Sequence, residues 1–205
     1  MRKSLLALAV LALVASPVVA GKFNKKVSVG DKAPSFDGIP ATFKGNDASI
    51  SLSDIKDDVV VLVFLANHCP VVTAYEDRII DFVNEYKDKG VRVVAVAVQG
   101  GNYTNTDNLP AIKERVKERG YNYVYGYDAS QKIGRDYGAT NTPQFFVLDK
   151  DRTIRYLGAM DDSQNEAKVS KTYLKDAVDA ILADKTPEVT ETRPVGCGVV
   201  YTKKK

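Results

Sequence analysis

Continuous and periodic hydrophobic stretches alternate along the chain. Two nearly unbroken runs of apolar, mostly β-branched residues, at 59–66 and 91–98, predict strands that are buried on both faces. Between them, apolar residues recur at intervals of three and four over 72–89 and end at Gly90, which predicts an amphipathic helix closed by a glycine. A buried strand, a tight turn and a helix therefore follow one another.

The alternation continues through the rest of the domain. After the second run we predict a charged helix, a short strand, a short helix, a β-hairpin and a closing amphipathic helix, at 109–119, 123–125, 129–137, 144–149 with 153–158, and 165–183. Before the first run, glycines and alternating apolar residues in 29–39 and 41–55 predict an N-terminal hairpin. This order indicates the α/β class, with a central sheet flanked by helices.

The two ends of the chain differ from this pattern. Arg2 and Lys3 precede an apolar run, and small residues follow at 18–20, which is typical of a cleaved secretory signal peptide. Two prolines and scattered threonines at the other end predict an extended tail, packed over the domain or partly mobile. We divide the chain into a signal peptide, a domain and a C-terminal tail, at 1–20, 21–184 and 185–205. The mature protein is expected to be periplasmic or secreted, with no membrane span.

Charge and cysteine content narrow the possible functions. The chain has 29 Lys and Arg against 26 Asp and Glu, and loss of the signal peptide removes two Lys and Arg, leaving a net charge of +1. This balance does not predict nucleic-acid binding. Two cysteines are too few for a disulfide scaffold, so each needs its own explanation.

Cys69 stands where the first buried strand gives way to the helix, with Pro70 at the first helical position. Free N–H groups and the dipole at a helix N-terminus stabilise negative charge, which favours the reactive thiolate. The alternative is that Cys69 is a small buried core residue. Its position at the junction favours a reactive thiol.

Two separated segments resemble the thioredoxin superfamily. VVVLVFLANHCPVV is similar to its strand and active-site segment, and GATNTPQFFVLDKDRTIRYLG is similar to its cis-proline loop and β-hairpin. VSVGDKAPSFDG further resembles the redoxin or AhpC/TSA (peroxiredoxin-like) branch. The resemblance implies a thioredoxin-like three-layer fold over 27–183, with an N-terminal hairpin extension.

The active-site segment departs from both familiar patterns. Val72 stands where a thioredoxin CxxC motif has its second cysteine. Ala66 and Leu62 stand where a typical peroxiredoxin has a hydroxyl residue and a proline. The Asn67-His68-Cys69-Pro70 motif and the later Gly196-Cys197 instead resemble a group of redoxin-like proteins that carry both.

Cys197 is the only intramolecular partner available to Cys69. About thirteen tail residues, at up to ~3.3–3.6 Å each, can cross a domain of this size. The flanking Gly196 and Gly198 would let the tail approach a crowded site. Three alternatives stay open: reversible pairing, a static disulfide, or no contact.

Other residues are expected around Cys69. By resemblance, Asn67 and His68 before it and a cis Thr142-Pro143 opposite it line the substrate site. His68, the only histidine, is expected to shield or tune the thiolate rather than bind a metal. Residues 76–78 are expected on a solvated helix face, and Arg152 and Arg155 are candidates to steady the thiolate.

The function expected from these residues is an exported thiol oxidoreductase without a cofactor. Cys69 would attack a small-molecule peroxide or a protein disulfide, and Cys197 or an external thiol reductant would resolve the product. A thioredoxin-fold binding module with a structural disulfide is the alternative, and copper or other metal handling is a third.

Overall fold

The computed structural model describes residues 21–203, so the predicted signal peptide lies outside the described residues. At its centre, β3 (Val59–Phe64) and β4 (Val91–Ala97) run parallel with Val59 opposite Val91. The remaining strands of this sheet are β1 (Ile39–Phe43), β2 (Asn46–Ile50), β5 (Val124–Tyr127), β7 (Gln144–Leu148) and β8 (Ile154–Gly158). The strand order β2-β1-β5-β4-β3-β7-β8 combines parallel and antiparallel neighbours, which confirms a mixed sheet.

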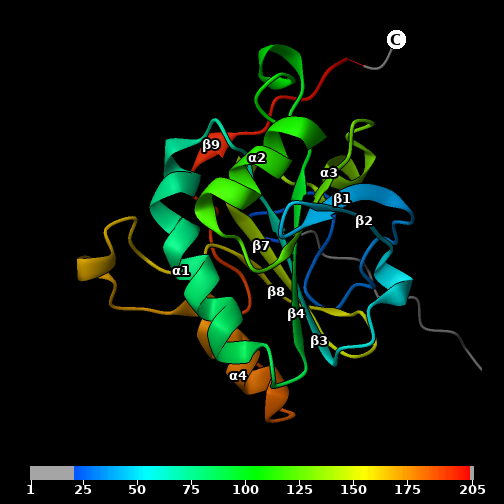
Figure 1. Cartoon of the computed structure of the whole chain (residues 1–205). Coiled ribbons are helices and arrows are strands. Elements are labelled where there is room, and N and C mark those ends of the chain that lie inside the picture. The colour runs from blue at the N-terminus through cyan, green and yellow to red at the C-terminus, as the bar shows by residue number, and fades with distance from the viewer. Residues whose placement is uncertain (1–20, 204–205) are drawn as a thin grey trace, which may run out of the picture.

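Successive residues of β3 point into two separate cores. Val59, Val61 and Val63 belong to one apolar cluster, and the residues between them belong to the other. The first cluster packs under α1 (Pro70–Tyr86), α2 (Leu109–Arg119) and α4 (Tyr173–Leu182), and the second under α3 (Lys132–Tyr137) and the N-terminal segment. The sheet therefore lies between two covering layers (Figure 1), as predicted, and the continuous hydrophobic run reflects burial on both faces.

The N-terminal hairpin is present, but its strands lie elsewhere than predicted. The turn falls at Lys44 and Gly45, with φ of 51° and 82°. Two consecutive positive φ values define a type I′ turn, which fits the twist of a two-residue hairpin. Both strands therefore lie within 39–50, whereas the predicted first strand lay in 29–39.

The closing helix is shorter than the predicted 165–183. A 3₁₀ turn, η3 (Glu166–Lys168), comes first, and α4 begins only at Tyr173. The Asp162 carboxylate accepts hydrogen bonds from the backbone N–H groups of Ser170 at 2.9 Å and Lys171 at 3.1 Å. These bonds stabilise a loop between the two helical segments, because side-chain acceptors compete with helix for backbone donors.

The tail crosses the domain, passes beside the start of α1 and continues to Gln131, whose side chain accepts a hydrogen bond from the Thr202 N–H. Its short strand β9 (Cys197–Gly198) pairs with β6 (Asn141–Thr142) in a separate two-stranded sheet. In Figure 1, β9 is the red strand next to the N-terminal end of α1. Two further 3₁₀ turns are η1 (Leu52–Asp54) and η2 (Gly101–Tyr103). Among the helices of residues 21–203, none has the length and apolar character to cross a membrane.

Candidate functional site

The strand–helix junction holds Cys69 as the sequence predicts. Cys69 is the N-cap residue of α1, with Pro70 at the first helical position, and its carbonyl accepts a hydrogen bond from the Thr73 N–H at 3.2 Å. Cys69 is 0% exposed. Its Sγ therefore lies at the positive end of a seventeen-residue helix, where a thiolate would be stabilised.

The cis-proline loop lies directly against this cysteine. The Thr142–Pro143 peptide bond is cis, as the resemblance implied, and the Thr142 carbonyl oxygen is 3.2 Å from Cys69 Sγ. The side-chain hydroxyl of Thr142 is buried without a hydrogen-bond partner. The loop thus places a backbone carbonyl beside the sulfur.

Cys197 forms a disulfide bond with Cys69. The two Cα atoms are 5.9 Å apart, although 128 positions separate them in the sequence. On the strand pair, Cys197 lies opposite Thr142, and the Asn141 side chain donates a hydrogen bond to the Gly196 carbonyl at 3.0 Å. The sequence-based alternative in which the two cysteines make no contact is therefore wrong.

Glycine at position 196 is required by this close approach. Its φ is +153°, and a Cβ added there would lie 2.0 Å from the Thr142 carbonyl oxygen. Nothing lies within 4 Å of a Cβ added at Gly198. Of the two flanking glycines, only Gly196 is needed for the tail to reach the loop.

The tail is fixed to the domain on both sides of Cys197. Before it, the Thr192 N–H donates to the Leu157 carbonyl at 3.0 Å. After it, Val200 is held on both sides, because its N–H donates to Gln99 Oε1 at 2.9 Å and its carbonyl accepts from Gln131 Nε2 at 2.8 Å. Of the two tail conformations expected from the sequence, the packed one is observed.

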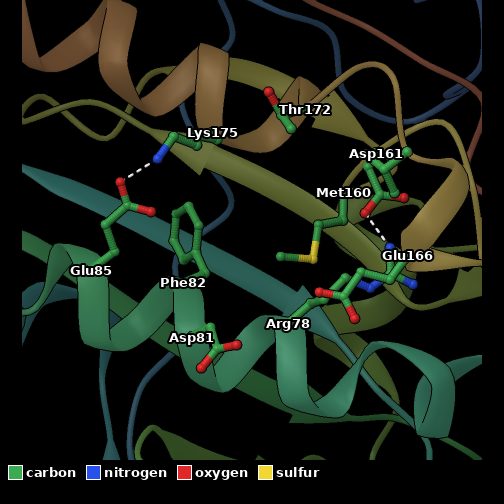
Figure 2. Close-up of a pocket in the computed structure, with 10 residues that line it drawn as sticks. Arg78, Asp81, Phe82, Glu85, Met160, Asp161, Glu166, Thr172 and Lys175 are labelled. Carbon is green, nitrogen blue, oxygen red and sulfur yellow. Dashed lines mark hydrogen bonds and ion pairs between the residues drawn. The ribbon is translucent and has the colours of Figure 1, made fainter.

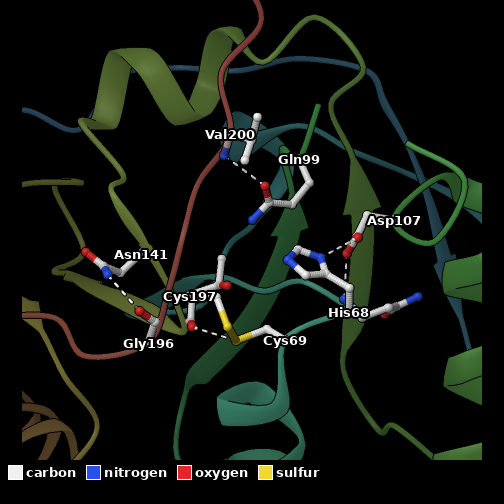
Figure 3. The surroundings of a disulfide bond; sticks show 10 residues. His68, Cys69, Gln99, Asp107, Asn141, Gly196, Cys197 and Val200 are labelled. Atoms are coloured by element: carbon white, nitrogen blue, oxygen red, sulfur yellow. Dashed lines mark hydrogen bonds and ion pairs between the residues drawn. A yellow bond between two sulfur atoms is a disulfide. The ribbon is translucent and has the colours of Figure 1, made fainter. Parts of the chain in front are cut away.

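His68 is turned toward a buried carboxylate. Its Nδ1 lies 2.7 Å from Asp107 Oδ2 (Figure 3). Its ring stacks on Tyr103, with 3.6 Å between the two ring centroids. The other oxygen of Asp107 accepts a hydrogen bond from the Asn67 N–H at 2.5 Å. Asp107 is 0% exposed, so this carboxylate fixes the two residues before Cys69.

Sequence reasoning missed Asp107 and Tyr103. Both lie in the connection that follows β4, and β4 runs parallel to the strand that leads to Cys69. The carboxyl ends of neighbouring parallel strands meet at one edge of a sheet. Polar residues in the loop after β4 could therefore have been predicted to lie near Cys69. Within residues 21–203, no group of three or more His, Cys, Asp and Glu side chains could hold a metal ion.

Two charged residues of α1 are buried, which corrects the prediction of a solvated face at 76–78 for Glu76 and Arg78, whereas Asp77 is exposed as predicted. Glu76 is 1% exposed, accepts hydrogen bonds from Arg115 and Tyr121, and forms an ion pair with Arg119. Arg78 is 9% exposed and pairs with Asp161. Burial of these charges is tolerated because each has an opposite charge as its partner.

Arg78 and Asp161 also line a hollow of about 240 Å³ between α1 and the segment that leads to α4 (Figure 2). Tyr75, on the same helix, donates a hydrogen bond to Asp161 at 2.9 Å. Burial, and then the Asp161 carboxylate, raise the pKa of Tyr75 to about 12. Neither cysteine lines this hollow, so it is separate from the disulfide.

The arginines of the β7–β8 hairpin do not reach Cys69. Arg152 donates to the carbonyls of Ile55 and Asp57, which precede β3, whereas Cys69 follows the other end of that strand. Arg155 pairs with Asp149 at 3.2 Å. The prediction that either steadies the thiolate is wrong.

Comparison with known proteins gives consistent results. The profile of the family described as Redoxin matches residues 28–174. The thiol-disulfide oxidoreductase ResA of Bacillus thuringiensis (strain Al Hakam) is 28% identical over 150 residues, covering 72% of this chain and 80% of that protein.

Solved structures share the fold. An uncharacterized conserved protein from Geobacillus kaustophilus has a TM-score of 0.79 at 29% identity, covering 87% of this chain and 94% of that one. A thiol:disulfide interchange protein of the thioredoxin family from Chlorobium tepidum TLS has a TM-score of 0.53 at 20% identity, covering 67% and 91%. This second likeness bears on the fold alone.

Proposed function

The chain belongs to the Redoxin family, and from that premise we propose that it is a thiol–disulfide oxidoreductase whose redox couple is the Cys69–Cys197 pair. The observation that carries the proposal is the bond between these cysteines at the N-terminus of α1, beside the cis Thr142–Pro143 bond. The substrates are protein disulfides, and an external thiol reductant regenerates the dithiol. The name of the Bacillus relative supports this activity.

The other site residues act around this pair. Thr142 and Pro143 line the disulfide, because Thr142 lies opposite Cys197 on the β6–β9 pair and its carbonyl oxygen is 3.2 Å from Cys69 Sγ. Asn67 and His68 form the opposite wall, and Asp107 holds both in place. These roles are proposed from contacts with the cysteine-bearing turn.

Two further sequence-based expectations concern peroxide reduction and export. Peroxide reduction stays a prediction without added support, because the named relative is a thiol–disulfide enzyme. We retain export as a proposal on the pattern of residues 1–20, since disulfides persist in oxidising compartments.

Reduction of insulin by dithiothreitol, followed as turbidity, tests the proposed function. The purified protein should accelerate the reaction, and Cys69→Ser and Cys197→Ser should each abolish the acceleration, because one thiol cannot complete the dithiol cycle. Val189→Ser, at an exposed position of the same tail, is the matched control and should remain active. A protein that gives no acceleration, and whose bond resists dithiothreitol while folded, would be a binding module with a structural disulfide.

A further inference from the structure

The two sulfurs of the disulfide differ in their access to solvent, and this difference bears on the proposed exchange reaction. Cys69 is 0% exposed, whereas Cys197 is only partly buried. Gly198, next to Cys197, is exposed, and Val195, two residues before it, is 50% exposed. A partner therefore meets the tail before it can meet Cys69.

The surroundings of Cys69 reinforce the difference. Cys69 belongs to the buried apolar cluster that includes Leu65 and Val72, and the cis-proline loop covers its sulfur. Cys69 also stands at the N-terminus of α1, where free N–H groups and the helix dipole favour its departure as a thiolate. Access favours attack at Cys197, and thiolate stability favours departure of Cys69.

On the basis of the proposed function, we infer that partners exchange at Cys197 and that Cys69 is the internal thiol. This reverses the roles expected from the sequence, in which Cys69 attacks and Cys197 resolves. The partner is a protein that presents an accessible disulfide or thiol to the tail.

The reaction balances as follows for the reduced enzyme. The Cys197 thiolate attacks one sulfur of the partner disulfide, and the other partner sulfur leaves as a thiolate that takes a proton from water. The Cys69 thiolate then attacks Cys197 Sγ, the enzyme disulfide forms, and the second partner sulfur leaves. The enzyme loses two electrons and the partner gains two.

An external dithiol reverses these steps. Its first thiolate attacks Cys197 Sγ, and Cys69 leaves as the thiolate at the helix N-terminus. The second thiolate of the dithiol then attacks the first sulfur of the same reductant, which is bonded to Cys197 Sγ in the mixed disulfide. The reductant closes to its own disulfide, and Cys197 leaves as a thiolate. The reductant is oxidised by two electrons, and the enzyme is reduced by two.

The anchored tail allows Cys197 to present its sulfur and then return. Thr192 on one side and Val200 on the other stay hydrogen-bonded to the domain by contacts that do not involve the disulfide. Only the short segment between them needs to move. A thiol tethered in this way keeps a high effective concentration near Cys69, as a closely spaced CxxC pair does.

Mapping of mixed disulfides on the wild-type protein tests the inference without substitution. The oxidised protein is treated with excess glutathione, a monothiol, then quenched by alkylation and analysed by peptide mass. Glutathione is expected on Cys197, with Cys69 recovered as the alkylated free thiol. Reduced Cys69→Ser and Cys197→Ser provide the second measurement, in which each single thiol reacts with glutathione disulfide.

Cys69→Ser, which keeps Cys197, should form its mixed disulfide at least about tenfold faster than Cys197→Ser. Glutathione on Cys69 in the wild type, or an equal or faster reaction of Cys197→Ser, would overturn the inference and leave the proposed function standing. Absence of a mixed disulfide on either cysteine, together with an unopened bond, would overturn both.

Discussion

The two cysteines of the disulfide occupy very different surroundings. Cys69 is fully buried, at a position determined by a core strand and the first turn of a long helix. Cys197 is partly exposed on a strand of two residues, fixed by a neighbouring glycine and by side chains from elsewhere in the domain. The comparison sets a buried internal thiol against a partly exposed thiol on an anchored tail, so perturbing the tail should affect exchange more than perturbing the α1 side away from the cysteine.

The largest effect short of removing a cysteine is expected from Gly196→Ala. Its Cβ would lie 2.0 Å from the Thr142 carbonyl, so the β6–β9 pairing must shift. We expect the ratio of disulfide to dithiol in a fixed glutathione buffer to fall by about tenfold or more, which corresponds to ~1.4 kcal/mol or more. Alkylation followed by mass measurement gives the ratio.

Gly198→Ala is the matched control, because nothing lies within 4 Å of its added Cβ. It should keep the wild-type ratio. Equal losses in the two variants would show that general flexibility of the tail, and not the close approach at Gly196, controls the pairing.

A smaller effect is expected from Gln131→Asn. The shorter side chain loses its hydrogen bonds to Val200 and Thr202 but tolerates the positive φ of 59° at this position. A net ~0.5–1.5 kcal/mol per hydrogen bond predicts a several-fold slower closure of the disulfide from the dithiol. Stopped-flow oxidation measures this rate, and Lys132→Gln, an exposed neighbour, serves as control. An unchanged rate would show that the Gln131 anchor does not hold Cys197 in place.

Asp107→Asn perturbs the other side of the comparison. Asp107 accepts from the Asn67 N–H and contacts His68 and Thr106, and the amide cannot accept from all three. A loss of ~1–3 kcal/mol in the free energy of unfolding is expected from urea denaturation. The ratio of disulfide to dithiol in the same glutathione buffer should change less than in Gly196→Ala, and a larger change would mean that His68 takes part in the exchange itself.

The smallest effect on exchange is expected from Tyr75→Phe, which removes the hydroxyl that donates a hydrogen bond to Asp161. Burial and Asp161 raise the pKa of Tyr75 in the folded state to about 12, above its ordinary value of 10.0. Its contribution to stability is therefore fully present below pH 10 and is lost as the pH rises toward 12.

Tyr75→Phe should consequently lose less stability than the wild type over that interval, as measured by urea unfolding at several pH values. Its insulin reduction near neutral pH should be unchanged. If the free energy of unfolding fell equally with pH in both proteins, Tyr75 would not be a source of the loss of stability at alkaline pH.

The sequence predicts one side of the comparison well and the other poorly. Cys69 is recognisable because a buried strand, a proline and a helical period are local patterns. The position of Cys197 depends on Thr142, Gln99 and Gln131, which come from three distant segments. A hydrophobic period in the sequence carries no information about contacts of this kind. The tail's extended conformation was predictable, but its hydrogen-bond partners were not.

Charged residues show the same limit. From the sequence alone, Glu76 and Arg78 are expected on a solvated helix face. Whether a charged side chain can be buried depends on a partner of opposite charge, which here lies elsewhere in the chain. Arg115 and Asp161 supply those partners from α2 and from the loop that follows β8. Asp107 was not predicted, because it lies in the polar loop between β4 and α2 and belongs to no recognisable motif.

A redox titration of the folded protein tests the central claim most directly. The protein is equilibrated in a series of buffers with different ratios of reduced to oxidised dithiothreitol. Free thiols are then alkylated and counted by mass spectrometry, and circular dichroism measures whether the fold is retained. A reversible Cys69–Cys197 couple predicts one two-electron transition in which both thiols appear together, with the fold retained and the bond restored on reoxidation. A bond that opens only when the protein unfolds would contradict the account.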